Sequence, residues 1–211
     1  MVQKPAPELS VEDIERFGPD PLGAFKANLA RVEERIAAAC ERAGRDRAAV
    51  RLMPVTKTVP AHVLRFAFAA GIRSFGENKI QEAQGKREAL DDLPVDWSII
   101  GHLQTNKVKY LTRFAREFHA LDSLRLADLL NKRLEREDRF LDVYVQVNTS
   151  SEESKYGLSP DALLPFVDGA FSIAAKSGSL ARIASASAFA SAKISVASRL
   201  ATSRRASARF S

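Results

Sequence analysis

The chain of 211 residues has a single cysteine, Cys40, and no long apolar run. One thiol cannot form an internal disulfide or a cysteine-built zinc site, and we assign no metal ligands. No window reaches the ~18 uninterrupted apolar residues of a membrane span. The N-terminal segment MVQKPAPELSVEDIERFG (1–18) also lacks the apolar stretch of a secretory signal. Because 45% of the residues are hydrophobic and 27% are charged, we expect a globular cytoplasmic protein that binds no membrane.

The net charge of +6 comes entirely from the C-terminal end of the chain. Residues 168–211 hold seven basic residues and one acid, whereas residues 1–167 hold 25 of each. The basic balance therefore says nothing about the partners of the main part of the chain. Within 168–211 the aromatic residues are only Phe171, Phe189 and Phe210, too few for a base-stacking surface, so we expect no specific nucleic-acid partner.

The composition changes abruptly near Val167. Residues 168–211 contain 13 Ala and 11 Ser, whereas the preceding part is rich in Leu, Val, Glu and Asp. Serine weakens helices and few large apolar side chains remain to offset the entropy of ordering. We therefore divide the chain into a main part, 1–167, and a tail, 168–211. Three origins of the tail stay open: a disordered basic extension, a divergent end of the domain, or translation in a shifted reading frame.

Strands and helices are predicted to alternate through the main part. A first helix over residues 20–44 has Asp20 as its N-cap, Pro21 at its first position and Gly44 as its stop. Five strand–helix units follow. The strands are predicted at 50–55, 72–75, 97–100, 118–121 and 141–148, and their helices at 60–70, 78–90, 105–114, 123–136 and from 159 or 160 onward.

Five strands, each followed by a helix, predict an α/β fold with a parallel sheet. The two candidates are an open doubly wound sheet and a (β/α)₈ TIM-barrel-like fold. No Gly-x-Gly-x-x-Gly motif follows the first predicted strand, which weighs against a dinucleotide-binding sheet. A barrel needs eight units, and only about five are recognisable, so the barrel would be incomplete.

Polar residues follow every predicted strand, at the edge where ligands of parallel sheets bind. Taken singly, each has an ordinary structural explanation, such as a solvated lysine or a helix cap. Taken together, they predict a polar rim. The segments are Thr56-Lys57-Thr58, Gly76-Glu77-Asn78, Gly101-His102-Leu103-Gln104, Asp122-Ser123 and Asn148-Thr149-Ser150.

Lys57 has a particular chemical use if it ends a buried first strand. Partial burial lowers the pKa of an ammonium group, and the neutral amine can attack an aldehyde to form a Schiff base. Pyridoxal phosphate is an aldehyde cofactor that fits this chemistry, with hydroxyls, amides and helix N-termini available for its phosphate. Position and chemistry permit this interpretation without requiring it.

Five segments closely resemble the pyridoxal phosphate homeostasis protein family, the small YggS-type proteins similar to the N-terminal barrel of alanine racemase. The resemblance extends from about Leu22 to Val167, and the motifs stand in the family's order. They are LMPVTKTVP (52–60), FGENKIQEAQGK (75–86), WSIIGHLQTNK (97–107), ALDS (120–123) and VQVNTSSEESKYGL (145–158).

The resemblance implies a cofactor site. Lys57 would hold pyridoxal 5′-phosphate as a Schiff base, Asn78 and His102 would lie around the cofactor, and Asn148 and 155–157 would lie near the pocket rim. It also implies a monomeric, non-catalytic carrier that serves vitamin B6 homeostasis, with small amino acids as further partners. The alternative is an amino-acid racemase, which needs acid–base groups on both faces of its substrate. None of the three tyrosines lies in a motif of that type.

The tail departs from the family pattern. Beyond Val167 the family continues with strands that carry the serine, glycine amides and arginine of the phosphate site, and 168–211 contains no credible match to them. At about 1–3 kcal/mol for each lost charge-assisted bond, cofactor binding would weaken by several kcal/mol. An inactive, truncated family member is therefore a further alternative.

Overall fold

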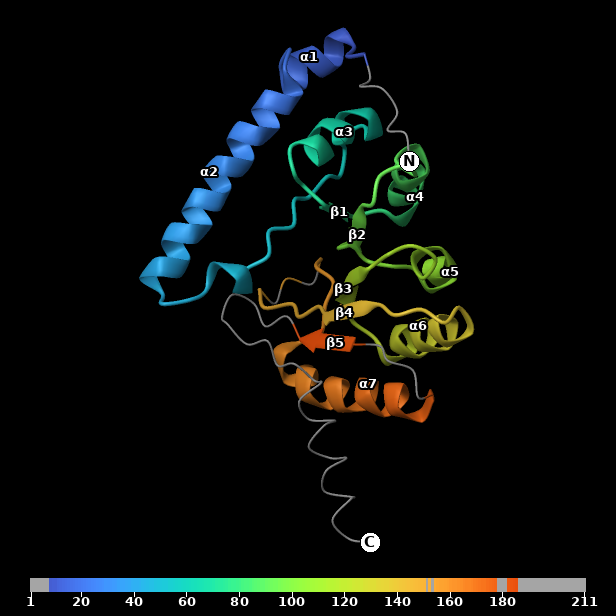
Figure 1. Cartoon of the computed structure of the whole chain (residues 1–211). Coiled ribbons are helices and arrows are strands. Elements are labelled where there is room, and N and C mark those ends of the chain that lie inside the picture. The colour runs from blue at the N-terminus through green and yellow to red at the C-terminus, as the bar shows by residue number, and fades with distance from the viewer. Residues whose placement is uncertain (1–7, 151, 153, 178–181, 186–211) are drawn as a thin grey trace, which may run out of the picture. The chain divides into compact units, whose positions relative to one another are not determined.

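The computed structural model describes residues 8–150, 152, 154–177 and 182–185. The chain divides into two compact units. Unit 1 consists of residues 1–77 and 81–96, and unit 2 consists of residues 78–80 and 97–211. Figure 1 shows the elements in their order along the chain.

Unit 1 is built mainly from helices. Its elements are α1 (Val11–Phe17), α2 (Pro21–Arg42), the 3₁₀ turn η1 (Arg47–Ala49), α3 (Ala61–Ala69), β1 (Ser74–Glu77) and, from residue 81 on, α4 (Ile80–Ala89). α2 begins as predicted, with the Asp20 side chain accepting from the Gly23 amide and Pro21 at the first position. Its stop also agrees with the prediction, because Gly44 follows the last turn with a φ of +59°.

The first predicted strand is the main error of the sequence analysis within unit 1. Residues 50–55 form no strand, and only an isolated parallel bridge joins Val55 to Gly76. The segment is also not buried, since Val55 is half exposed. A run of apolar residues predicts a buried strand only when a neighbouring strand pairs along its length, and here the pairing with β1 is limited to this bridge.

Unit 2 is a parallel α/β layer. Its strands are β2 (Asp96–Ile99, of which the last three residues belong to this unit), β3 (Glu117–Leu121), β4 (Asp142–Val145) and β5 (Arg182–Ser185). β3 pairs in parallel with β2 and β4, and β4 pairs in parallel with β5. The helical elements are η2 (Thr105–Lys107), α5 (Val108–Leu111), α6 (Leu124–Arg136), η3 (Pro160–Ala162) and α7 (Leu163–Ser177).

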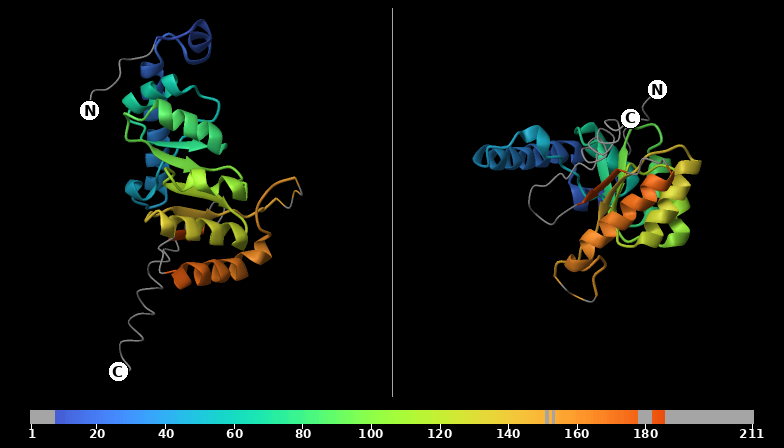
Figure 2. Two further views of the ribbon diagram at one scale, coloured as in Figure 1. Left: turned by 90° about the vertical axis from the view of Figure 1, so that its right-hand side faces the viewer. Right: turned by 90° about the horizontal axis from the view of Figure 1, so that it is seen from below.

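Helices α6 and α7 cover one face of this sheet (Figure 2). Apolar residues of β3 and β4, such as Leu121 and Val143, meet Leu130 of α6 and Ile173 of α7 around a small cavity. α6 begins as predicted, with Ser123 as an N-cap that accepts a hydrogen bond from the Leu126 amide. The alternation of parallel strands and covering helices confirms the α/β class.

The change of composition at Val167 falls inside a helix. α7 continues from Leu163 to Ser177, because the spacing of Phe166 and Ala170 keeps the buried face in register and alanine favours helix. β5 follows and pairs with all of β4. The division into 1–167 and 168–211 therefore stays a prediction from composition. Residues 178–181 and 186–211, with most of the tail, lie outside the described residues.

None of the helices in the described ranges is both long and apolar enough to span a membrane.

Candidate functional site

Lys57 lies in a two-residue turn immediately after the Val55 bridge. The turn is attached to β1 by two backbone bonds, from the Thr56 amide to the Gly76 carbonyl at 2.8 Å and from the Gly76 amide to the Pro54 carbonyl at 2.9 Å. Thr58 has a φ of +65°, a left-handed conformation that is an outlier for a β-branched residue. The chain therefore reverses at Lys57 in a strained turn, which needs strong partners to persist.

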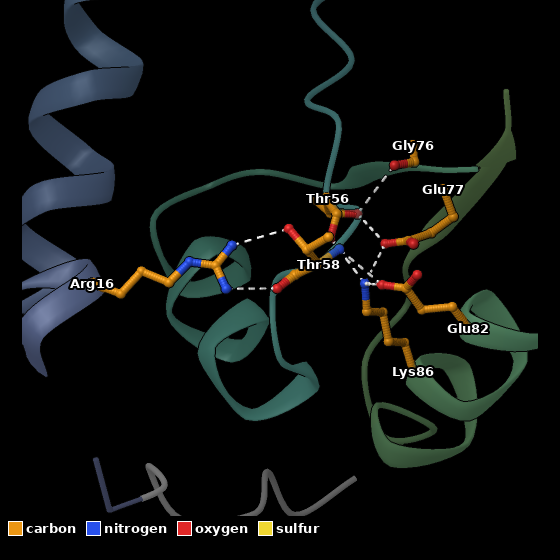
Figure 3. A network of polar contacts seen from close by, with 7 residues as sticks. All are labelled: Arg16, Thr56, Thr58, Gly76, Glu77, Glu82 and Lys86. Atoms are coloured by element: carbon orange, nitrogen blue, oxygen red, sulfur yellow. Dashed lines mark hydrogen bonds and ion pairs between the residues drawn. The ribbon is translucent and has the colours of Figure 1, made fainter. Parts of the chain in front are cut away.

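The Thr56 side of this turn is fixed by a buried charged cluster (Figure 3). The Thr56 hydroxyl donates to Oε1 of Glu77 at 2.6 Å, and the Lys86 ammonium donates to the same oxygen at 2.8 Å and to the Thr56 carbonyl at 2.9 Å. The side chain of Glu77 is fully buried and that of Lys86 is 8% exposed. A buried ion pair of this kind tolerates the loss of neither partner, so it holds Thr56 rigidly.

The Thr58 side is held by residues from two other helices. Oε1 of Glu82 on α4 accepts from the Thr58 amide at 2.9 Å and from Lys86 at 2.6 Å. Arg16 of α1 donates to the Thr58 carbonyl at 2.8 Å and to its hydroxyl at 3.0 Å (Figure 3). Both neighbours of Lys57 are therefore clamped through their backbone and their side chains.

The Lys57 side chain itself is exposed, and it has no hydrogen bond or ion pair with any described residue. The expectation of partial burial at the end of a buried strand is thus wrong, because residues 50–55 do not form that strand. What the turn provides is an amine on a fixed backbone, open to solvent. Its use as a cofactor-binding residue stays a prediction.

Asn78 and His102, the other two predicted site residues, lie in unit 2 and are brought together there. Asn78 is half-buried and His102 is exposed at its surface. Between them stands Gly101, where any side chain would collide with the backbone carbonyl of Asn78. Glycine at this position lets the two chain segments touch, and so places the Asn78 backbone beside the start of the His102 segment.

The His102 ring is held by two side chains of unit 2. The Tyr156 ring stacks on it with centroids 4.1 Å apart and an interplanar angle of 12°. On its edge, Nδ1 lies 3.6 Å from an Asp122 carboxylate oxygen, a distance suited to an ion pair when the ring is protonated. The imidazole is therefore oriented between an aromatic face and an acid.

Tyr156 reaches His102 because the chain after β4 turns back on itself. Val147 and Leu158 form an isolated parallel bridge, and the Asn148 amide donates to the Leu158 carbonyl at 2.8 Å. The side-chain amide of Asn148 also donates to the Glu152 carbonyl at 2.9 Å. The sequence analysis placed Asn148 and residues 155–157 near the rim, and the structure adds the stacking of Tyr156 on His102.

Sequence reasoning missed the residues that hold the Lys57 turn. Glu77 and Glu82 lie in the signature stretch 75–86 with Lys86, but no contact was assigned to them. The spacing of Glu82 and Lys86, four residues apart on one helix, indicates an ion pair and could have suggested part of the cluster. No local signal points to Arg16.

The comparisons with known proteins agree with this chain's motifs. Residues 24–210 match the sequence model of the alanine racemase N-terminal domain, a range that continues past Val167. A pyridoxal phosphate homeostasis protein of Aquifex aeolicus is 46% identical over 135 residues, which are 64% of this chain and 59% of that protein. One of Pseudomonas aeruginosa is 44% identical over 67% of this chain and 62% of the relative. The chain thus spans about three fifths of the length of these relatives.

Solved structures show the same fold. PipY of Synechococcus elongatus PCC7942, solved without pyridoxal phosphate, has a TM-score of 0.60 and 29% identity over 83% of this chain and 80% of its own. The same protein with pyridoxal phosphate bound has a TM-score of 0.59 and 28% identity, with coverage of 84% and 80%. With the family match, this likeness confirms the TIM-barrel-like α/β fold.

Proposed function

The chain belongs to the alanine racemase N-terminal domain family, and from that membership and the geometry of the Lys57 turn we propose that it binds pyridoxal 5′-phosphate and serves intracellular pyridoxal phosphate homeostasis. The names of the relatives and the PipY structure with pyridoxal phosphate support this function. The observation that carries the proposal is that the Lys57 amine is exposed while both neighbouring residues, Thr56 and Thr58, are held by hydrogen bonds.

The described residues fit the aldehyde end of this cofactor. The Lys57 amine is accessible and is not engaged with a described side chain, so an aldehyde can reach it. We propose that the two condense: a C=N bond forms, and the carbonyl oxygen leaves as water with two hydrogens of the amine. When bound, the cofactor supplies an electron sink for amino groups. Asn78 offers an amide and His102 an oriented imidazole, and we propose them as cofactor-binding residues of unit 2.

A carrier role follows from what the chain's side chains offer. Lys57 provides covalent capture, but racemisation needs a second acid–base group on the opposite face of the substrate. Tyr156, one candidate for such a group, stacks on His102. We therefore propose a carrier that holds the cofactor rather than a racemase. We further propose that it is monomeric and cytoplasmic, with small amino acids as additional partners.

The test is capture of pyridoxal phosphate by the full chain. The protein is mixed with the cofactor, reduced with borohydride and digested, and the modified lysines are identified by mass spectrometry. We expect Lys57 to carry the reduced adduct at the lowest cofactor concentrations, and Lys57→Ala to lose the visible absorbance of the complex. Lys26→Ala, an exposed lysine of α2, is the matched control and should behave as the parent.

Equal labelling of Lys57 and Lys26 in the parent would contradict the proposal, because it would show ordinary surface chemistry.

The phosphate site is tested separately. A chain whose residues 168–211 are replaced by a family-like C-terminus, with the serine, glycine and arginine motifs, should bind the cofactor more tightly, because a phosphate dianion needs several donors in place of its hydration shell. A parent that binds equally tightly would exclude the inactive, truncated alternative.

A further inference from the structure

Helix α1 makes two contacts within unit 1, one with the turn that carries Lys57 and one with the start of α3. Near its C-terminal end, Arg16 donates to the carbonyl and to the hydroxyl of Thr58. One turn earlier, the Asp13 carboxylate lies 2.8 Å from Nε2 of His62, close after the turn at the start of α3. α1 precedes the segment that matches the family model, which begins at residue 24.

The contacts of Arg16 complete the fixation of Thr58. Glu82 accepts from the Thr58 amide, and Arg16 binds the Thr58 carbonyl and side-chain oxygen, so every polar atom of this residue has a partner. Thr58 needs these partners, because a β-branched residue at a φ of +65° is under strain and relaxes when it is released. Relaxation of Thr58 would turn the preceding peptide and redirect the Lys57 side chain.

The contacts on the Thr56 side of Lys57 and those on the Thr58 side differ in what their removal would do to the protein. Removing Lys86 leaves the buried Glu77 without its cation and destabilises the whole unit. Arg16 is exposed, so its removal leaves no buried charge, and only the Thr58 side of the turn is released. The effect of Arg16 on Lys57 can therefore be measured apart from folding.

We propose that Arg16 is a positioning residue for Lys57, through which the N-terminal helix sets the direction of the amine that captures the aldehyde. This inference rests on the proposed function. Arg16 touches neither cofactor nor reacting atoms; it holds the Thr58 carbonyl and hydroxyl, and these fix the backbone from which the Lys57 amine extends. A guanidinium suits the task because its planar fork reaches two oxygens at once.

The experiment compares the full-length parent with Arg16→Ala, Arg16→Lys and Arg31→Ala. Arg31 is the matched control, an exposed arginine of α2 that contacts Asn28 and does not touch the turn. The rate at which the borohydride-reducible adduct forms at Lys57 is measured by quenching with borohydride at successive times after addition of pyridoxal phosphate. Hydrogen exchange of the Thr58 amide is measured without cofactor, and the thermal midpoint is recorded for each variant.

For Arg16→Ala we expect capture at Lys57 to slow by roughly tenfold, because the amine is no longer pre-oriented. Exchange of the Thr58 amide should accelerate, and the thermal midpoint should stay close to that of Arg31→Ala. Arg16→Lys should recover part of the rate, since an ammonium reaches one of the two oxygens, and Arg31→Ala should match the parent. A merely structural role would instead lower the midpoint and leave the capture rate of the folded protein unchanged.

The experiment distinguishes failure of the positioning role from failure of the proposed function. If the parent forms its adduct at Lys57 and Arg16→Ala forms it at the same rate, the positioning role is overturned and the proposed function stands. If the parent forms no preferential adduct at Lys57, the proposed function fails, and the positioning role fails with it.

Discussion

The two regions that carry the predicted site residues are held in different ways. Around Lys57, in unit 1, the chain is fixed by charges: a buried Lys86–Glu77 pair, Glu82 and an arginine from another helix. Around His102, in unit 2, it is fixed by close backbone approach at Gly101 and by the stacked Tyr156 ring.

This difference matches the role that we propose for each region. A strained turn that presents an amine needs strong, directional bonds to its backbone, and buried charged groups provide them at a cost in desolvation. A ring that we propose to lie beside a ligand needs a defined orientation but can retain some freedom, and stacking provides this with about 0.5–1.5 kcal/mol. The comparison predicts the largest effect for a substitution in the buried charged cluster of the first region and smaller effects for substitutions in the second region.

The largest effect is expected for Lys86→Met. The methionine fills a similar volume but leaves the fully buried Glu77 carboxylate without its cation, so the free energy of unfolding should fall by about 3–5 kcal/mol. Urea denaturation measures this loss. The control is the double variant Glu77→Gln/Lys86→Met, which removes both charges and should recover a good part of the stability. Equal losses in the single and the double variant would show that the uncompensated charge of Glu77 is not what destabilises Lys86→Met.

A smaller effect is expected for Gly101→Ala in unit 2. The new methyl group would collide with the Asn78 carbonyl and force the two segments apart, at about 1–3 kcal/mol. Gly85→Ala is the matched control: it lies in α4, no atom is within 4 Å of the added carbon, and alanine there should stabilise the helix by about 0.5–1 kcal/mol. Thermal unfolding measures the stability of both variants. A Gly101→Ala variant as stable as the parent would show that the segments at Asn78 and Gly101 do not touch.

The parts of this structure that could be predicted are those with local signals. The starts of α2 and α6 follow from Asp20 and Ser123, because an N-cap acts on amides two or three residues away. The predicted strand at 50–55 is wrong for the opposite reason: strand formation depends on a partner distant in sequence, and only Val55 has one. The change of composition at Val167 is likewise a local signal, and α7 continues through it, so the division there stays a prediction.

The same distinction between local signals and contacts with distant residues applies to the candidate site. The rule that ligands lie at the ends of parallel strands directed attention to the segments at Lys57 and His102, whose role as a ligand site stays a prediction. The side chains that hold them could not be predicted, since Arg16 reaches Thr58 across 42 residues of sequence and Tyr156 depends on the return of a loop to His102. Contacts of this kind are set by packing, which no local pattern encodes.

A still smaller effect is expected at the stack of Tyr156 on His102. Tyr156→Ala removes a half-exposed ring, so the unfolding free energy should fall by only about 0.5–1 kcal/mol. The sharper readout is the NMR signal of the His102 ring protons, which should lose its ring-current shift in Tyr156→Ala and keep it in Tyr156→Phe. An unshifted signal in the parent would show that the rings do not stack in solution.

The smallest effect concerns the pH dependence of α1. Hydrogen bonds from the Ser10 hydroxyl, from His62 and from the Ser10 amide lower the pKa of Asp13 from 3.8 to about 2. Because this pKa is lowered in the folded state, the stabilisation by Asp13 is complete above pH 3.8 and is lost as the pH falls toward 2. Ser10→Ala removes the strongest of these bonds, so it should raise the pKa of Asp13 and destabilise the protein near neutrality, with the difference from the parent shrinking in acid. An NMR titration of the Asp13 carboxyl, with Ser10→Thr as the variant that keeps the hydroxyl, measures the shift. An unchanged Asp13 pKa in Ser10→Ala would mean that the hydroxyl does not contribute to the shift and that His62 and the Ser10 amide hold the carboxylate.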